Sequence, residues 1–274
     1  MALSYGTGPF GAQAAGRFNF DAPRKGVLYL EDSPRRLRGL LAGETIVDSR
    51  RVKLLHESDH LPVWYFPQED LRMDLLRPTE HSTRCPWKGD ASYWSVVHGD
   101  RVEENAVWSY PQPVAGAEAL AGLMAFRFAA LDRWLEEDEP VIGHPRDPYH
   151  RIDVRHSSRH VRVSLNGEVV AETRRAKVLF EAGLPPRWYM PLDDVRQEVL
   201  VESDTSTTCA YKGHASYWSA RVGDAVEKDV LWTYREPLHD ARPVEGYVAF
   251  FNEHVDIELD GEPQERPRTQ WSER

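Results

Sequence analysis

Cysteine is scarce in this sequence, since its 274 residues contain only two, Cys85 and Cys209. A disulfide framework needs a denser set of cysteines, so this count favours folding in a reducing compartment. Neither cysteine belongs to a CxxC pair, which excludes a four-cysteine zinc site within one domain. We expect no disulfide between the two cysteines, no bound metal and no cofactor.

Long apolar runs and an excess of positive charge are also missing. No stretch approaches a membrane-spanning run of about 18 apolar residues, and the segment Met1–Gly6 has neither the basic nor the apolar part of a signal peptide. The formal net charge is -10, whereas a nucleic-acid binder needs a basic surface to contact phosphates. We therefore expect a cytoplasmic protein that binds neither membrane nor nucleic acid.

The sequence does contain an internal repeat. A shift of 124 positions aligns Leu37–Pro113 with Val161–Pro237 without a gap, and about 33 of these 77 positions are identical. A gapless match of this length indicates the duplication of a whole domain. We expect a monomer whose two copies pack as an internal pseudo-dimer, because a duplicated domain often reproduces an ancestral twofold dimer.

The repeat and the local composition divide the chain into segments. The acidic run Glu136–Pro140 closes the first copy, and the turn-rich run Gly143–Pro148 is typical of a linker. The predicted segments are an extended N-terminal arm (1–26), a first repeat domain (27–140), a linker (141–150), a second repeat domain (151–263) and a flexible tail (264–274).

Most of each copy has the pattern of short strands. Val161–Val170 alternates around an Asn-Gly turn, and Ala91–Tyr110 has the pattern of a hairpin around Gly99-Asp100. Pro67–Leu76 and its repeat Pro191–Leu200 suit a short helix. We predict an all-β class with minor short helices, in two tandem copies.

One motif carries most of the candidate chemistry. It has the pattern Cys-x-x-Lys-Gly-x-Ala-Ser-Tyr-Trp and occurs at 85–94 and 209–218. The glycine permits a tight turn that places the lysine at the start of a strand. The tyrosine and the tryptophan then point to opposite faces of that strand, and an opposing strand adds a Trp-x-Tyr pair. The candidate ligand-binding residues are Lys88, Tyr93, Trp94, Trp108, Tyr110, Lys212, Tyr217, Trp218, Trp232 and Tyr234.

Together with an upstream Trp-Tyr-x-Pro-x-x-Asp, this motif resembles the domain-of-unknown-function family 427 over nearly all of each repeat. Ala210 departs from the family's proline, which would loosen the turn of the second copy. The resemblance implies a small β-tent-like fold, similar to that of methionine sulfoxide reductase B and of the thalidomide-binding domain of cereblon. It implies no settled activity, although some members carry a nucleotidyltransferase-like label.

The reactive residues each allow two interpretations. Cys85 and Cys209 are weak candidates for catalytic nucleophiles beside the lysine, but free cysteine is common in protein cores, and we favour that interpretation. Lys88 and Lys212 could neutralise a phosphate or a carboxylate, or could be paired with an acidic residue or solvated.

The acidic residues of the repeat also have a functional and a structural interpretation. Glu80 and Asp204 precede the cysteines by five positions and are weak candidates for a general base, but an ion pair with the motif lysine is favoured. Asp70 and Asp194 are interpreted as residues at a helix N-terminus.

These patterns favour a small-molecule-binding protein. A pocket walled by aromatic rings with one cation suits an anionic or planar ligand. Two alternatives stay open: a nucleotidyltransferase-like or cysteine-dependent enzyme, and a structural or protein-interaction module. A metal-dependent nucleotidyltransferase needs paired carboxylates near a glycine-rich phosphate turn. Adjacent acids occur at Glu69-Asp70 and Asp193-Asp194, but no such turn lies next to them.

Overall fold

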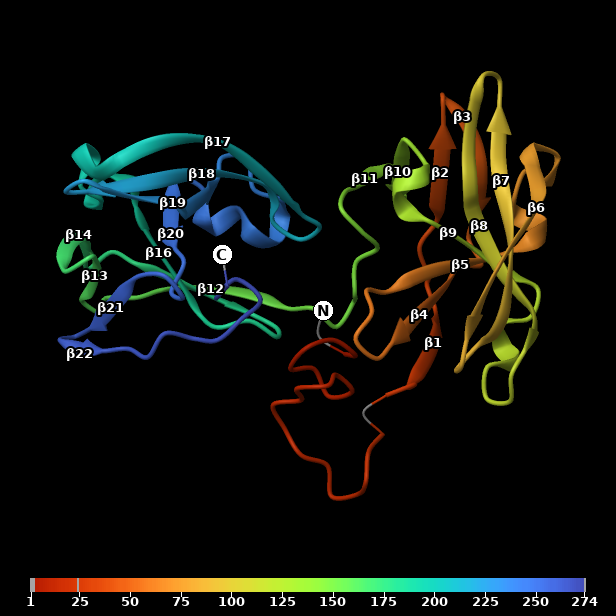
Figure 1. The fold of residues 1–274 in the computed structure, drawn as a ribbon, viewed down its shortest axis with the longest axis horizontal. Coiled ribbons are helices and arrows are strands. Elements are labelled where there is room, and N and C mark those ends of the chain that lie inside the picture. The colour runs from red at the N-terminus through yellow and green to blue at the C-terminus, as the bar shows by residue number, and fades with distance from the viewer. Residues whose placement is uncertain (1–2, 24, 274) are drawn as a thin grey trace. The chain divides into compact units, whose positions relative to one another are not determined.

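The computed structural model describes residues 3–23 and 25–273. The chain divides into two compact units, Met1–Tyr149 and His150–Arg274, which we call the first and the second domain. Each is built from strands and a few short 3₁₀ helices (Figure 1). The predicted all-β class and the tandem arrangement are thus confirmed. Within the described residues, no helix is both long enough and apolar enough to cross a membrane.

The first domain contains two antiparallel sheets. The larger has the strand order β1-β4-β5-β9-β8-β7-β6, and the smaller has the order β11-β10-β2-β3. The strands are β1 (Leu28–Asp32), β2 (Leu37–Leu41), β3 (Glu44–Ser49), β4 (Lys53–Glu57), β5 (Val63–Pro67), β6 (Leu76–Cys85), β7 (Gly89–His98), β8 (Arg101–Pro113), β9 (Leu123–Phe126), β10 (Arg133–Glu136) and β11 (Glu139–Val141). The 3₁₀ helices are η1 (Gln68–Asp70), η2 (Met73–Leu75), η3 (Glu118–Leu120) and η4 (Phe128–Ala130).

The second domain repeats this topology strand for strand. Its larger sheet has the order β12-β15-β16-β20-β19-β18-β17, and its smaller sheet has the order β14-β13-β21-β22. The strands are β12 (Ile152–His156), β13 (Val161–Leu165), β14 (Glu168–Thr173), β15 (Lys177–Glu181), β16 (Arg187–Pro191), β17 (Leu200–Cys209), β18 (Gly213–Val222), β19 (Ala225–Tyr234), β20 (Tyr247–Phe250), β21 (Asp256–Leu259) and β22 (Glu262–Pro263). The 3₁₀ helices are η5 (Leu192–Asp194), η6 (Gln197–Val199) and η7 (His239–Val244).

The larger sheet of each domain buries both of its faces. In the first domain, one face joins the smaller sheet in a core that includes Leu37, Ile46 and Phe66, all fully buried. The other face carries a separate cluster that includes Leu55 and Tyr65. Successive residues of a strand point to opposite faces, so Tyr65 and Phe66 serve different clusters. The motif residues Tyr93, Trp108 and Tyr110 lie on the face that carries Tyr65.

Turn chemistry explains why the hairpins form where the sequence predicts them. Asn166 and Gly167 have φ angles of 52° and 83° between β13 and β14, and Ala42 and Gly43 have 50° and 83° between β2 and β3. Two successive positive φ angles define the type I′ turn that suits a tight hairpin.

The prediction of a single short helix over Pro67–Leu76 is wrong. Two 3₁₀ turns, η1 and η2, are separated there by an extended residue, Leu71, with φ -104° and ψ 150°. Leu71 is buried and forms an isolated bridge with Val47 of β3. The contact with the sheet interrupts the helix, and Val195 repeats it against Ala171.

The N-terminal arm is attached to the first domain mainly through its backbone. The amide of Asp59 donates to the carbonyl of Ser4, which is buried, at 2.7 Å. Phe18 lies between Phe10 and Phe20, with ring centroids 5.5 and 4.8 Å away. Phe20 itself is exposed, so these rings pack mainly on one another.

Candidate functional site

The Cys-x-x-Lys-Gly motif forms the tight turn between β6 and β7. Gly89 has a φ of 108°, which favours glycine, and a Cβ there would lie 3.0 Å from the carbonyl oxygen of Gln112. The Lys88 amide donates to the carbonyl of Cys85 at 3.3 Å, and the Val114 amide donates to the carbonyl of Lys88 at 3.2 Å. The lysine is therefore held by backbone contacts on both sides, as a tight glycine turn predicts.

The side chain of Lys88 forms a buried ion pair. Its ammonium group donates to the carboxylate of Glu57 at the end of β4, and each residue is 8% exposed. The second domain reproduces the pair in Lys212 and Glu181, also buried. A buried charge without a partner is costly, so the pair fixes the motif turn against the end of β4 in the first domain and of β15 in the second.

The prediction that these lysines pair with Glu80 and Asp204 is wrong. Glu80 and Asp204 are exposed on β6 and β17, within the stretches where the pairing register with the next strand shifts. The true partner Glu57 lies on β4, which is not adjacent to β6 or β7 in the sheet. Only the three-dimensional arrangement of the strands brings it to Lys88.

The buried carboxylate of the second domain has a further partner. Nε2 of His150 lies 3.0 Å from Oε1 of Glu181, and the ring of Tyr211 stacks on His150 with centroids 3.9 Å apart. Burial alone would raise the pKa of Glu181, but Lys212 and His150 together lower this pKa to about 2. Burial also lowers the pKa of His150 below its ordinary value. The carboxylate is therefore held in its charged form.

The aromatic residues of the motif separate onto the two faces of the larger sheet. Trp94 packs against the core between the sheets, whereas Tyr93, Trp108 and Tyr110 belong to the cluster on the other face. The Lys88 ammonium group lies 5.8 Å from the centroid of the Tyr110 ring. The structure thus brings together four of the five candidates of the first domain and excludes Trp94.

The second domain repeats this separation. Trp218 packs against the core between the sheets, and Tyr217, Trp232 and Tyr234 share the other face. These last three are buried, whereas Trp108 in the first domain is only partly buried. The aromatic face is therefore more accessible in the first domain.

A hydrogen bond between two rings recurs on this face. Nε1 of Trp108 donates to the hydroxyl of Tyr65 at 3.2 Å, and Nε1 of Trp232 donates to the hydroxyl of Tyr189 at 3.0 Å. Burial raises the pKa of both tyrosine hydroxyls well above the ordinary value, so both stay protonated near neutral pH.

Both cysteines are free and half-buried. Cys85 packs against the aromatic cluster of the first domain, and Cys209 packs against that of the second. This packing supports the core interpretation over the nucleophilic one.

The segment His56-Glu57-Ser58-Asp59-His60 has the HExxH spacing of a zinc motif, which works by placing two histidines on one face of a helix. Here the segment is the end of β4 and the turn after it. Nε2 of His56 lies 2.8 Å from Glu31, Nδ1 of His60 lies 2.8 Å from the Ser58 carbonyl, and Glu57 pairs with Lys88. Over the described part of the chain, no group of three potential ligands could hold a metal ion.

Asp70 and Asp194 were interpreted as helix N-terminal residues, but they connect the sheet to the 3₁₀ turns instead. Asp70 accepts a hydrogen bond of 2.6 Å from the Ser49 hydroxyl and pairs with Arg51. Asp194 accepts from Thr173 at 2.5 Å and pairs with Arg175.

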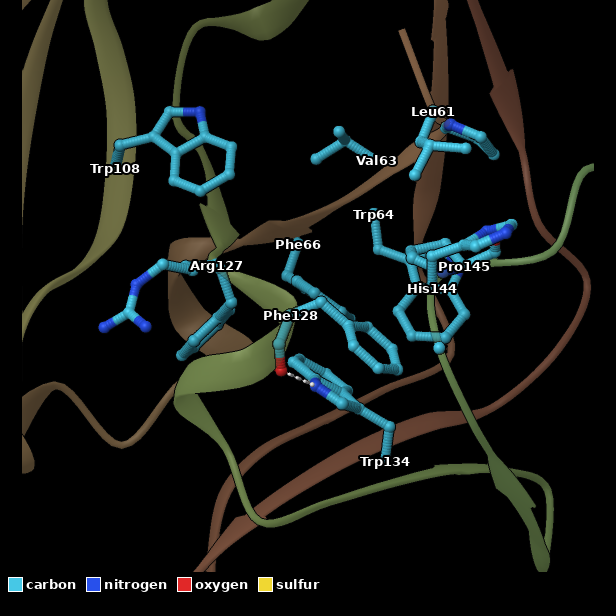
Figure 2. A pocket seen from close by; sticks show the side chains of 13 residues that line it. Leu61, Val63, Trp64, Phe66, Trp108, Arg127, Phe128, Trp134, His144 and Pro145 are labelled. Atoms are coloured by element: carbon cyan, nitrogen blue, oxygen red, sulfur yellow. Dashed lines mark hydrogen bonds between the residues drawn. The ribbon is translucent and has the colours of Figure 1, made fainter. Parts of the chain in front are cut away.

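The first domain has a pocket at one end of its larger sheet, where β5 begins and β9 ends (Figure 2). Its volume is about 220 Å³. The lining includes Trp108 from the predicted set but not Lys88. Trp108 and Arg127 lie on one side, with His144 and Pro145 on the other (Figure 2). The lining residues are Leu61, Pro62, Val63, Trp64, Phe66, Trp108, Phe126, Arg127, Phe128, Trp134, Gly143, His144 and Pro145.

The corresponding place in the second domain contains different residues. The repeat replaces Val63 by Arg187 and Ala129 by Glu253. The Arg187 guanidinium donates two hydrogen bonds of 2.7 Å to the Glu253 carboxylate, and the two residues are 4% and 7% exposed. A buried ion pair therefore occupies the position where the first domain has the small side chains of valine and alanine.

Aromatic rings enclose this ion pair. Phe251, which replaces Arg127, lies 4.4 Å from Trp232 between ring centroids. The Arg187 guanidinium lies 5.6 Å from the ring of Trp232 and 5.4 Å from that of Trp271. The second domain thus places a buried ion pair and aromatic rings at the position that corresponds to Val63 of the first domain's pocket.

Most of the pocket residues differ between the two copies, so the shared motif did not predict them. Phe128 and Trp134 become Asn252 and Glu258 in the second copy. Their side chains nevertheless support the pocket, and Nε1 of Trp134 donates to the Phe128 carbonyl at 2.9 Å. A comparison of where the copies differ in side-chain volume and polarity would have pointed to this region.

The comparison with protein families finds the same domain twice. A family model described as a domain of unknown function (DUF427) matches residues 29–137 and again residues 153–261. These segments coincide with the two repeats and together cover more than half of the chain. No curated protein matches the sequence.

Proposed function

The chain belongs to the DUF427 family as a tandem two-domain member, and from this premise we propose that it is a small-molecule-binding protein whose first domain holds one planar ligand. The observation that carries the proposal is the difference between the copies. Val63 is a small side chain that lines the pocket of the first domain, whereas its counterpart Arg187 forms a buried pair with Glu253 in the second.

The size and lining of the pocket define the ligand. A cavity of about 150 Å³ lined by apolar side chains can hold a benzene molecule. The pocket of the first domain is somewhat larger, about 220 Å³. It suits one or two fused rings that pack against Trp64, Trp108 and Trp134, because offset and edge-on ring contacts add to the burial of apolar area.

The cation that pairs with an acidic substituent of the ligand is Arg127 rather than Lys88. The charge of Lys88 is neutralised by Glu57. The side chain of Arg127 is 49% exposed at the margin of the pocket, and its ion pair with Glu103 is long, at 3.6 Å. A guanidinium in this position can meet a carboxylate with two parallel hydrogen bonds. We therefore assign the pocket to a planar ring that carries an acidic group.

Titration of the full chain with indole-3-acetate and with uncharged indole, followed by isothermal calorimetry, tests this assignment. We expect one site per chain and tighter binding of the acid. Val63→Phe should weaken both ligands at least tenfold because it fills the pocket. Arg127→Gln should remove only the preference for the acid, and the exposed Arg155→Gln of the second domain is the matched control. No heat with either ligand, or unchanged binding to the Val63→Phe variant, would refute the assignment.

A further inference from the structure

The last residues of the chain, expected to be a flexible tail, contact the second domain in an ordered way. The Thr269 hydroxyl donates to Oε1 of Glu253 at 2.5 Å. Nε2 of His254 lies 2.7 Å from the carbonyl oxygen of Trp271. The Trp271 ring lies 6.2 Å from that of Phe251 between centroids. One hydroxyl, one carbonyl and one indole therefore hold the segment in place.

Half-buried and exposed residues alternate along the segment 267–271, as they do in an extended peptide bound to a surface. Pro267, Thr269 and Trp271 are half-buried, whereas Arg268 and Gln270 between them are exposed. The surface beneath is a built site, because Glu253 is 7% exposed and its carboxylate oxygens are aimed at Arg187 and Thr269.

The tail lies in the same compact unit as the second domain but beyond the segment that the family model matches. The family match ends at residue 261, and the final strand β22 ends at Pro263. Arg187 still satisfies both oxygens of Glu253 when the Thr269 hydroxyl leaves. Gln264 and Arg266 still anchor the chain to β21, through the Ile257 carbonyl and the Asp256 carboxylate. The segment beyond them, 267–271, is the part that contacts Glu253 and His254.

We propose that the surface formed by Arg187, Phe251, Glu253 and His254 is a peptide-binding site, which the chain's own tail occupies in cis. Its partner is a protein segment with a hydroxyl residue two positions before a tryptophan. The hydroxyl donates to the Glu253 carboxylate. The indole lies 5.4 Å from the Arg187 guanidinium and 6.2 Å from the Phe251 ring, and contacts of a ring with a cation and with a second ring are both favourable.

The attached tail regulates access to the site. A linked ligand has an effective concentration in the millimolar range, so a partner peptide binds weakly while the tail is docked and more tightly once it is released. This inference does not depend on the pocket of the first domain, which lies in the other copy and has a different lining.

The experiment uses the full chain and a fluorescent synthetic peptide with the sequence of residues 262–273, and measures anisotropy. Trp271→Ala releases the tail, and we expect the peptide to bind this variant at least tenfold more tightly than the wild-type chain. Thr269→Val should give a smaller gain of about threefold, because one hydrogen bond is lost and the indole remains. A peptide with alanine at the tryptophan position should not bind either chain.

A thermal-shift measurement separates peptide binding from simple packing. If the tail is a ligand, the free peptide restores the melting temperature that Trp271→Ala loses. Failure of the peptide to restore it, or equal affinity for wild-type and variant chains, would overturn the proposal. A concentration-dependent dimer of the wild-type chain that Trp271→Ala abolishes would also overturn it, because the site would then serve a second copy.

Discussion

Lys88 and Glu57 lie 31 residues apart in the sequence, yet their charged groups are in direct contact in a buried position. The same contact recurs between Lys212 and Glu181. Because both domains bury the same lysine–glutamate salt bridge, we infer that the motif lysine stabilises the fold. A solvated surface lysine would not do so.

The first prediction concerns the stability of this pair. Lys88→Ala leaves Glu57 buried without its cation and should lower the free energy of unfolding of the first domain by about 3 kcal/mol. The double change Lys88→Met with Glu57→Leu should cost much less, because it removes both charges and keeps the volume. Denaturant-dependent hydrogen exchange, followed in peptides from residues 28–136, measures both. A loss under about 0.5 kcal/mol for Lys88→Ala would contradict the buried pair.

The second prediction concerns the motif turn. Gly89→Ala combines a positive φ with a Cβ placed 3.0 Å from the Gln112 carbonyl oxygen, and should destabilise the first domain by about 2 to 3 kcal/mol. Gly43→Ala is the matched control, because its φ is 83° and nothing lies within 4 Å of the added Cβ. It should cost only about 1 kcal/mol. Equal losses of unfolding free energy in urea titrations would show that the Gln112 contact has no effect.

The third prediction is a loss of stability in acid that depends on Glu181. Its pKa is lowered from 4.5 to about 2 by Lys212 and His150, against the opposing effect of burial. A lowered folded-state pKa stabilises the protein above about pH 4.5, and this stabilisation is lost as the pH falls toward 2. The shift corresponds to about 3 kcal/mol.

Urea unfolding of the chain at pH 7, 5 and 3 measures this acid dependence. The variant Glu181→Gln with Lys212→Met should have a flatter profile than the wild-type chain between pH 5 and 3. The lowered pKa of His150 acts in the same direction, because its protonation also favours the unfolded state. Identical profiles for the two chains would rule out the buried carboxylate as the source.

The fourth prediction uses the repeat as its own control. Trp108→Phe and Trp232→Phe each remove an indole donor to a buried tyrosine hydroxyl, and each should cost about 1 kcal/mol of stability. Only Trp108 lines the pocket of the first domain. Calorimetric titration with indole-3-acetate should therefore show about fivefold weaker binding for Trp108→Phe and no change for Trp232→Phe. Equal effects of the two substitutions on affinity would count against the pocket.

The pairing partner of the motif lysine shows where sequence reasoning stops. The position of Lys88 at a tight turn follows from Gly89, whose φ of 108° other residues avoid. The choice of Glu57 rather than Glu80 as the partner of Lys88 does not follow from the local sequence, because Glu80 is nearer in sequence but exposed on β6. Proximity along the chain is a poor guide to ion pairs when long strands carry neighbouring residues away from each other.

The duplication, the strand-rich class, the type I′ turn at Asn166-Gly167 and the opposite orientation of Tyr93 and Trp94 all follow from local sequence. Each of these depends on local periodicity or on the backbone preference of one or two residues, which the chain carries wherever it folds. The Glu57–Lys88 pair, the pocket beside Trp108 and the docking of the tail on Glu253 do not follow from local sequence. Each of these requires residues from elements that are not adjacent in the sheet or in the sequence to meet, and which elements meet depends on the packing of the whole domain.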